Sequence, residues 1–211
     1  YSDKRHPDTV QFATTIEEDL SRRDFTVNAI AVSLDGTVVD PHGGQADIER
    51  RTIRAVGDPI ARFAEDALRM MRAVRFATSL DFSIDDATLK AITSNATSLK
   101  DISAERVRDE LIKIIDTPRA LDGIQLLEDV GLLQFIIPEL REGLGVEQNL
   151  HHIYTVWEHN LRTMKYAADK SYSFAVRMAC LLHDVGKPRS KHGEGKHCTF
   201  YAHDAIGATM T

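Results

Sequence analysis

Residues 65–77, EDALRMMRAVRFA, constrain the fold of this chain of 211 residues more than any other stretch. At about 100° per residue, the charged and apolar side chains of residues 62–77 fall on opposite sides of a helical wheel. The charged side carries Arg62, Glu65, Asp66, Arg69 and Arg72, with Arg75 toward its edge. The apolar side carries Phe63, Ala64, Ala67, Leu68, Met70, Met71 and Val74. The pattern predicts one amphipathic helix over residues 60–79.

Two interpretations of the charged side are open. In the first it is a solvated face, with Glu65–Arg69 and Asp66–Arg69 pairs that each stabilise the helix by about 0.2–0.5 kcal/mol. In the second, Asp66 and Arg69 face a ligand, and Arg72 and Arg75 supply charge for phosphate. A carboxylate beside a guanidinium complements adenine and cytosine, which present an amino donor beside a ring-nitrogen acceptor; guanine and uracil present the reverse. Such a pair could select A and C without a template strand.

The remaining sequence is mostly helical, after a short N-terminal part with strand character. Asp35-Gly36 lies between apolar runs and suits a type I′ hairpin turn. Asp58-Pro59 is a helix start, Ser103 can cap residues 104–115, and Thr117-Pro118 opens a helix that Gly131 closes. Residues 141–148 are the best candidate linker, followed by helices over about 152–168 and 174–185 and a polar loop over 186–198. The sequence therefore predicts a mainly α chain with a small α/β remnant at its N-terminus.

Composition excludes several classes of protein. No run approaches the roughly 18 apolar residues of a membrane span, and no signal-peptide pattern opens the chain. Two cysteines cannot build a disulfide framework, which favours a reducing, cytoplasmic setting. The net charge of −6 argues against indiscriminate nucleic-acid binding, although basic residues at 50, 51, 54, 62, 69, 72 and 75 predict a local positive strip. Residue 1 is not Met and the chain stops in an expected helix start, so we expect a fragment of a longer protein.

Four stretches occur in a fixed order: RRDFTVNA at 22–29, DPHGGQADIERRTIRAVGDP at 40–59, EDALR at 65–69 and SAERVRDEL at 103–111. Together they resemble the bacterial-type (class II) tRNA nucleotidyltransferases, the CCA-adding enzymes and their poly(A) polymerase relatives, in the polymerase β superfamily. The resemblance implies part of a nucleotidyltransferase head over 1–59 and a helical neck and body over 60–140 that reads nucleotides and binds RNA.

The resemblance also implies roles for single residues. Arg23 and Asp24 would serve the sugar and phosphate of the incoming nucleotide, with Asn28 supporting them. Asp66 and Arg69 would read the base edge, and Glu65 would orient Arg69. The remaining nucleotide contacts implied on the same helix are Arg72 and Arg75.

The catalytic motif of this superfamily is not found in the chain. The resemblance implies an upstream Asp-x-Asp pair that holds Mg²⁺ for nucleotidyl transfer. Asp3 and Asp8 are not convincing substitutes for that pair. We therefore expect the chain to be inactive alone and the enzymatic activity to belong to the whole protein.

The last third of the chain is rich in histidine. His159 lies upstream of His183-Asp184 in LLHDVGKP, and Lys187 completes an HDxGK pattern. This resembles the HD superfamily of metal-dependent phosphohydrolases and implies an incomplete HD domain over 149–211. His159, His183 and Asp184 would hold a divalent metal such as Mn²⁺, Fe²⁺, Ni²⁺ or Zn²⁺.

The other histidines of this part, His192, His197 and His203, could supply a further metal or bind phosphate, or simply be solvated. The final Asp of the HD pattern is not identifiable, because Asp204 is too close in sequence.

The leading functional hypothesis is template-independent addition of C and A to the 3′ end of tRNA, using CTP and ATP. The motifs do not separate CCA-adding from CC-, A- or poly(A)-adding enzymes. One alternative is an HD nucleotide phosphatase or phosphodiesterase with a nucleotide-sensing front half. Another is a non-catalytic RNA-binding scaffold. The sequence predicts no membrane partner and does not indicate an oligomeric state.

Overall fold

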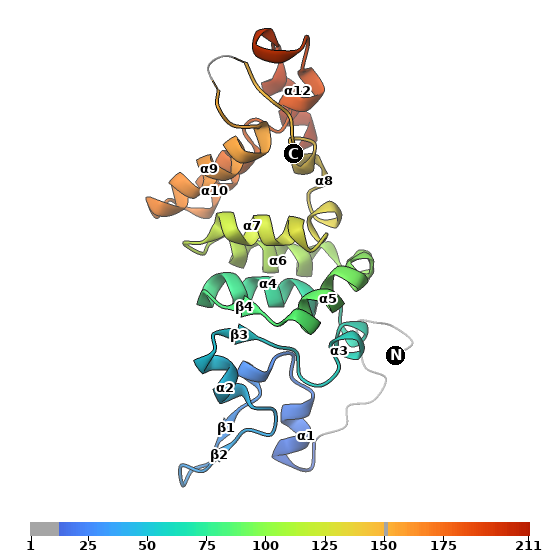
Figure 1. Ribbon diagram of the computed structural model, residues 1–211, viewed down its shortest axis with the longest axis vertical. Coiled ribbons are helices and arrows are strands. Elements are labelled where there is room, and N and C mark those ends of the chain that lie inside the picture. Colours follow the sequence, from blue (N-terminus) through green and yellow to red (C-terminus); the bar gives the residue numbers. More distant parts are fainter. Residues whose placement is uncertain (1–12, 150–151) are drawn as a thin grey trace.

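The structure is a computed structural model that describes residues 13–149 and 152–211. Helical layers are stacked along the long axis of the molecule, above a small base of short strands and helices (Figure 1). The base holds α1 (Ile16–Ser21), the 3₁₀ turn η1 (Thr26–Asn28), β1 (Ala31–Val32), β2 (Val38–Val39), α2 (Gly44–Glu49) and β3 (Thr52–Ile53). Both predicted features, a mainly α chain and a small mixed N-terminal part, are confirmed.

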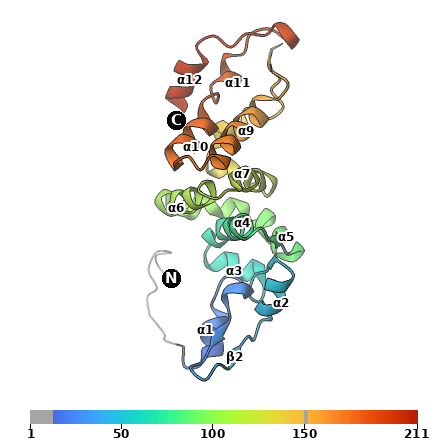
Figure 2. The same cartoon turned by 90° about the vertical axis from the view of Figure 1, so that its left-hand side faces the viewer.

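The middle of the molecule is helical and joins the base through a short parallel strand pair. Its elements are α3 (Pro59–Glu65), α4 (Leu68–Leu80), β4 (Ser83–Ile84), α5 (Asp86–Asn95), η2 (Ala96–Asp101), α6 (Ala104–Ile115), α7 (Ala120–Asp129), η3 (Leu133–Phe135) and α8 (Pro138–Arg141). β4 pairs with β3 in the register Thr52↔Ser83. Helices α4, α6 and α7 lie against one another, and a view turned by 90° shows the same stacking (Figure 2).

The upper part packs on α7 through a helical pair. It contains α9 (Val156–Asp169), α10 (Phe174–Leu182), α11 (Lys187–Ser190), η4 (Gly195–His197) and α12 (His203–Met210). The Thr155 and Glu158 side chains form a capping box at the start of α9, which fixes where this helix begins. Residues 186–198, predicted to be a loop, include α11 and η4, because Pro188 is compatible with the first turn of a helix.

The predicted single helix over 60–79 was wrong, because the chain breaks between α3 and α4. The backbone of Asp66 is extended, with φ −154°, and its Oδ1 accepts a hydrogen bond from the Leu68 amide at 3.1 Å. A carboxylate that pairs with one of the first amides of a helix acts as a cap. Helical periodicity continues across this break, so the wheel pattern alone did not reveal it.

The hairpin at Asp35-Gly36 forms, but its turn is not type I′. The Gly36 amide donates to the Ser33 carbonyl at 3.0 Å, and the Ser33 amide donates to the Thr37 carbonyl at 2.9 Å. Gly36 has φ +88°, whereas Asp35 does not have a positive φ. A type I′ turn needs positive φ at both central positions, so this is a three-residue loop that ends in a left-handed glycine.

Helix starts agree with the predicted residues to different degrees. Asp58 caps α3 through the Ile60 and Ala61 amides. Ser103 occupies the N-cap position of α6 without a hydrogen bond from its side chain, and α7 begins at Ala120, beyond Thr117-Pro118. Gly131 follows the end of α7 with φ +75°, as a closing glycine should.

One core runs through the stacked layers. A single cluster of buried apolar side chains extends from Phe25 in the base to Leu181 in α10. Residues 141–148, predicted to be a linker, are bonded to the start of α9 through their backbone: the Trp157 amide donates to the Gly143 carbonyl at 3.1 Å. In the described part of the chain, every helix is too short or too polar to cross a bilayer.

Candidate functional site

Asp24 is held at the interface between the base and α4. Its carboxylate is buried, and its Oδ2 accepts a hydrogen bond from Arg72 Nε at 2.7 Å. Its Oδ1 accepts hydrogen bonds from the Phe25 amide at 2.9 Å and from Asn28 Nδ2 at 3.4 Å. Arg23 points elsewhere and pairs with exposed Asp19 at 2.9 Å. The structure thus brings Asp24, Asn28 and Arg72 together and leaves Arg23 on the surface.

Arg69 faces the base of the molecule and is fixed from three sides. Its Nη1 contacts Glu65 Oε2 at 2.6 Å and the Arg62 carbonyl at 3.1 Å. Its Nη2 donates to the Arg22 carbonyl at 3.2 Å. Glu65 therefore contacts Arg69 in the way that an orienting carboxylate would, and the Glu65–Arg69 pair forms.

Asp66 has a different partner from the one that helical spacing suggested. Its Oδ2 lies 2.7 Å from Arg106 Nη2, on the first turns of α6, rather than pairing with Arg69. Arg106 was not among the predicted site residues, although it lies in the SAERVRDEL stretch. Asp66 borders an open cleft of about 590 Å³. The residues lining the cleft are Ala61, Phe63, Ala64, Glu65, Asp66, Ala67, Ser98, Asp101, Ile102 and Arg106.

Arg75 points into an internal ion pair. Its Nη1 lies 2.9 Å from Glu110 Oε2, and Glu110 is buried. The guanidinium also lies over the Phe76 ring, 4.3 Å from its centroid. Burial lowers the pKa of Arg75, although the Glu110 carboxylate opposes that shift. This pairing makes Arg75 part of the contact between α4 and α6.

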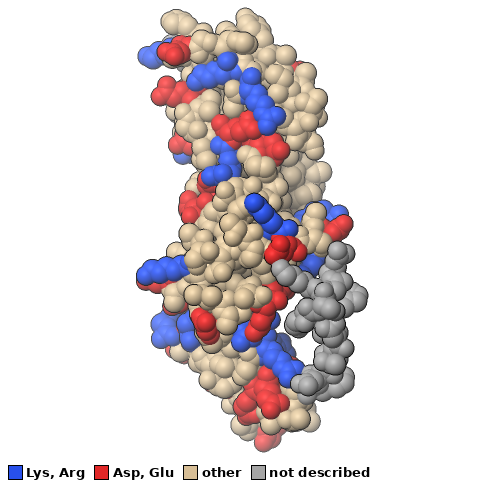
Figure 3. Space-filling view, turned by 90° about the vertical axis from the view of Figure 1, so that its right-hand side faces the viewer, with Lys and Arg blue, Asp and Glu red and all other residues tan. Residues whose placement is uncertain are grey.

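The predicted positive strip is largely neutralised by neighbouring carboxylates. Arg50 and Arg54 both pair with Asp47, and Arg62 pairs with Glu65. Basic and acidic side chains alternate over the face shown in Figure 3, so no large field of one sign forms there. Contacts of these arginines with a polyanion would have to compete with their ion pairs.

A second constellation lies where α9 meets the end of α10. His159 is on α9, and His183 and Asp184 follow directly after α10. The two Nε2 atoms are 3.1 Å apart, and they lie 3.4 and 3.3 Å from Asp184 Oδ2. Ligands about 2.0–2.2 Å from one ion lie roughly 3–3.5 Å from each other, so these three side chains fit a shared divalent metal.

The surroundings prepare these groups as ligands. His183 Nδ1 lies 2.8 Å from the Cys180 carbonyl, which leaves Nε2 turned toward Asp184. Burial lowers the pKa of His159, whereas the hydrogen bond with Asp184 raises the pKa of His183. Burial alone would raise the pKa of Asp184, but hydrogen bonds from His183 and Lys187 outweigh it and hold the pKa well below its ordinary value.

Of the other residues singled out in the last third of the chain, Lys187 and His203 contact Asp184. Lys187 Nζ lies 2.6 Å from Asp184 Oδ2, and His203 Nε2 lies 3.5 Å from Asp184 Oδ1. The backbone of His192 is paired with Thr199, His197 is in η4, and Asp204 is exposed on α12. Asp3 and Asp8 lie outside the described residues.

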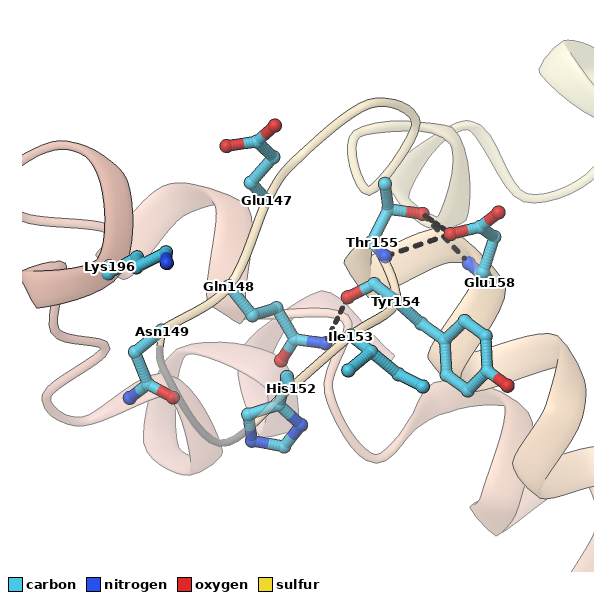
Figure 4. A pocket seen from close by; sticks show the side chains of 9 residues that line it. All are labelled: Glu147, Gln148, Asn149, His152, Ile153, Tyr154, Thr155, Glu158 and Lys196. Carbon is cyan, nitrogen blue, oxygen red and sulfur yellow. Dashed lines mark hydrogen bonds between the residues drawn. The ribbon is translucent and has the colours of Figure 1, made fainter.

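A pocket of about 440 Å³ opens beside the start of α9. Figure 4 shows Gln148, His152 and Tyr154 among its lining side chains. Gln148 Nε2 donates to the Tyr154 carbonyl at 3.1 Å, and its Oε1 accepts from Lys187 Nζ at 2.7 Å. Gln148 thus connects the pocket wall to the lysine beside Asp184. Sequence analysis missed Gln148, because it lies in the segment predicted to be a linker.

Comparison with protein families divides the chain into three matches. Residues 1–54 match the poly(A) polymerase head domain, residues 81–144 the probable RNA and SrmB-binding site of polymerase A, and residues 156–211 the HD domain. The chain belongs to the poly(A) polymerase and tRNA nucleotidyltransferase family. Members of the nucleotidyltransferase and HD families in general depend on metal ions.

Curated relatives of this family member include an A-adding tRNA nucleotidyltransferase from Deinococcus radiodurans. It is 41% identical over 213 residues, which cover 97% of this chain and 49% of the relative. A CCA-adding enzyme from Geobacillus thermodenitrificans is 51% identical over 142 residues, 67% of this chain and 35% of that enzyme. The chain thus spans about half the length of the first relative and about a third of the second.

A solved structure has the same fold over most of the chain. The Bacillus stearothermophilus CCA-adding enzyme in complex with CTP superposes with a TM-score of 0.64 at 38% identity. The match covers 84% of this chain and 42% of that enzyme. The predicted boundaries at 1–59, 60–140 and 149–211 stay predictions.

Proposed function

We propose that the protein containing this chain adds C and A nucleotides to the 3′ end of tRNA from CTP and ATP, in the cytoplasm. One observation carries the proposal: Asp66 and Arg69 are held by separate partners at 2.7 and 2.6 Å, and Asp66 borders an open cleft. An acceptor and a donor that are not spent on each other can present a pairing edge to a base. The relative at 51% identity is named a CCA-adding enzyme and the one at 41% identity an A-adding tRNA nucleotidyltransferase, and both names support nucleotide addition to tRNA.

In this proposal each residue of the site has a defined task. Asp66 accepts a hydrogen bond from the exocyclic amino group of cytosine or adenine, and Arg69 donates to the ring nitrogen beside it. Glu65 fixes Arg69. Asp24, supported by Asn28, and Arg72 serve the sugar and phosphates. Arg23 and Arg75 join them only by leaving their present partners, Asp19 and Glu110. Mg²⁺ would be held by upstream residues and would supply charge stabilisation for nucleotidyl transfer.

Changing Asp66 to Ala in the full-length natural protein tests the base-reading role. We expect selectivity for CTP and ATP over GTP and UTP to fall by about 10-fold or more, since a site built around hydrogen bonds discriminates through them. Single-turnover incorporation of each nucleotide into tRNA measures it. Asp109→Ala is the matched control, because Asp109 is exposed on α6 and pairs only locally with Arg108 in the described residues. Unchanged selectivity in Asp66→Ala would refute the proposal.

A second activity is supported by the cluster of His159, His183 and Asp184, whose ligand atoms all lie within 4.8 Å of one another. We propose that it holds a divalent ion such as Mn²⁺, Fe²⁺, Ni²⁺ or Zn²⁺ and that this part is a phosphohydrolase. Imidazole and carboxylate donors suit these ions, which when bound polarise phosphoryl oxygens and activate water. Lys187 neutralises Asp184 and offers a cation beside the site.

Binding of the ion should be visible without any substrate. Ligands that bind only the folded state raise its stability, so Mn²⁺ or Ni²⁺ should raise the melting temperature of the chain by several degrees. His183→Ala should abolish this shift, whereas His192→Ala, a change outside the cluster, should preserve it. An equal shift in wild type and His183→Ala would exclude the cluster as the binding site.

A further inference from the structure

Lys187 carries a buried ammonium group beside the candidate metal cluster. The residue is 7% exposed, and its Nζ lies 2.6 Å from Asp184 Oδ2. An ammonium has three N–H donors, and burying it is costly unless they find partners. Asp184 takes one of these donors, and Gln148 Oε1 takes a second at 2.7 Å. Among the described residues the third N–H has no oxygen or nitrogen partner, so it is available to a ligand.

The side-chain amide of Gln148 has only one orientation that satisfies both of its neighbours. Its Nε2 donates at 3.1 Å to the Tyr154 carbonyl, which can only accept a hydrogen bond (Figure 4). Its Oε1 faces the Lys187 ammonium, which can only donate. Turning the amide over would place like groups against each other at both ends. Because Gln148 is also buried, the acceptor for Lys187 is fixed in direction as well as in place.

The backbone that carries Gln148 is itself bonded to the segment that follows the cluster. Lys191 Nζ donates at 2.8 Å to the carbonyl of Glu147, the residue before Gln148. Arg189 forms two hydrogen bonds with the Glu142 carboxylate, at 2.8 and 2.6 Å. The acceptor therefore lies on a supported part of the chain, as a group that has to orient another side chain requires.

We propose that Gln148 is a positioning residue for the phosphohydrolase reaction, because it holds the Lys187 ammonium so that its third N–H binds a phosphoryl oxygen of the substrate. The inference rests on the proposed phosphohydrolase function. Without this acceptor, the flexible stem of Lys187 can turn the ammonium fully onto Asp184. The charge then stays near the site, but its donor is no longer directed at the substrate. The site thus includes a residue that precedes α9, outside residues 156–211 that match the HD domain.

Gln148→Leu in the full-length natural protein, loaded with Mn²⁺, tests this role. We expect inorganic phosphate to bind about 10-fold more weakly than to wild type, because one charge-assisted hydrogen bond is misdirected. The kcat for p-nitrophenyl phosphate should fall by a similar factor. Isothermal titration calorimetry measures phosphate binding, and the part of it that His183→Ala abolishes belongs to this site. Binding of Mn²⁺ alone should persist in Gln148→Leu, because the metal ligands are unchanged.

Two further variants separate positioning from folding. Glu142→Gln is the matched control: it weakens the contact with Arg189 on the same stretch of backbone, leaves Lys187 untouched and should behave as wild type. Gln148→Glu keeps an acceptor for Lys187 but, like Gln148→Leu, loses the donor to the Tyr154 carbonyl. It should melt no higher than Gln148→Leu and yet recover phosphate binding and turnover, which a purely structural role would not allow.

A double-mutant cycle isolates the contact between Gln148 and Lys187. In a Lys187→Met background, Gln148→Leu should cause no further loss of phosphate binding, because the group that it positions is gone. A full additional loss there would overturn the inference, as would wild-type phosphate binding in Gln148→Leu or equal losses in the Leu and Glu variants. Each of these results leaves the proposed phosphohydrolase function intact. If wild type bound Mn²⁺ but hydrolysed no phosphate ester, that function would fail, and this inference with it.

Discussion

Asp47 illustrates how a single residue organises the base of the molecule. Its carboxylate is 1% exposed and accepts a bond from Thr26 Oγ1 at 2.6 Å. Arg50 and Arg54 approach it at 2.7 Å each, and Arg54 also donates to the His42 carbonyl at 2.8 Å. Removing one partner from such a buried network leaves the others unsatisfied. Asp47 thus ties η1, α2 and the chain leading out of β3 into one unit beside Asp24.

Asp47→Asn is expected to change how stability depends on pH. Burial would raise the pKa of Asp47, but bonds from Thr26, Arg50 and Arg54 outweigh it and hold the pKa below the ordinary value of an aspartate. A lowered pKa in the folded state contributes stability above the unfolded-state value, and this contribution is lost as pH falls through the folded-state value. Asp47→Asn should cost about 1–3 kcal/mol at pH 7 and lose less stability than wild type between pH 5 and pH 2. Urea unfolding across this range measures both, with Asp109→Asn as the exposed control; parallel pH curves would contradict the expectation.

At the scale of elements, the close packing of α11 and α12 supports the cluster of His159, His183 and Asp184. Gly186 precedes α11 at the point where α12 crosses. A Cβ on Gly186 would lie 2.2 Å from the His203 carbonyl, whereas one on Gly207 of α12 would lie no nearer than 3.4 Å to another atom. Contact at Gly186 therefore sets how closely α12 brings His203 to Asp184.

Gly186→Ala should be destabilised by about 1–3 kcal/mol, because overpacking must push α12 away. It should also weaken the stabilisation by Mn²⁺, since the cluster adjoins this crossing. Gly207→Ala is the matched control; it should be neutral or slightly stabilising, because Ala favours a helix over Gly. Thermal unfolding with and without the ion distinguishes the two, and equal behaviour of both variants would show that the crossing tolerates a side chain.

At the scale of the whole molecule, the upper helices are bonded to the middle ones through a buried guanidinium. Arg177 on α10 is 8% exposed, and its Nη1 donates to the Ile115 and Thr117 carbonyls at 2.8 and 2.9 Å. Its Nε donates to the Tyr172 carbonyl at 2.9 Å. These bonds satisfy carbonyls at the end of α6, the helix whose other end carries Arg106.

Arg177→Met should separate the unfolding of the upper helices from that of the rest. Carbonyls left without partners cost about 1–3 kcal/mol each, so the HD part should melt first, in a separate transition. Calorimetry of wild type, Arg177→Met and Arg162→Met measures this, since Arg162 is exposed on α9 and serves as control. A single transition at the wild-type temperature in Arg177→Met would show that the apolar core alone couples the parts.

Several features were predictable from the sequence because they depend on neighbours along the chain. Helical character follows from apolar spacing, the start of α3 from Asp58-Pro59, and the hairpin from Asp35-Gly36. Pairing of His159 with His183-Asp184 also followed, since two consecutive helices can place such residues together. The mainly α fold and family membership needed no coordinates.

Tertiary structure decided the rest, because packing and desolvation join residues that are distant in sequence. Spacing along one helix offered Arg69 as the partner of Asp66; the docking of α6 supplied Arg106 instead, and Asp66 became a cap at a helix break. The sequence offered the arginines of the positive strip as charges for phosphate. In the structure Arg75 is paired with Glu110, Arg50 and Arg54 with Asp47, and Arg72 with Asp24. A sequence pattern states which side of a helix is charged, but the electrostatic partner is chosen by whichever element packs against that side.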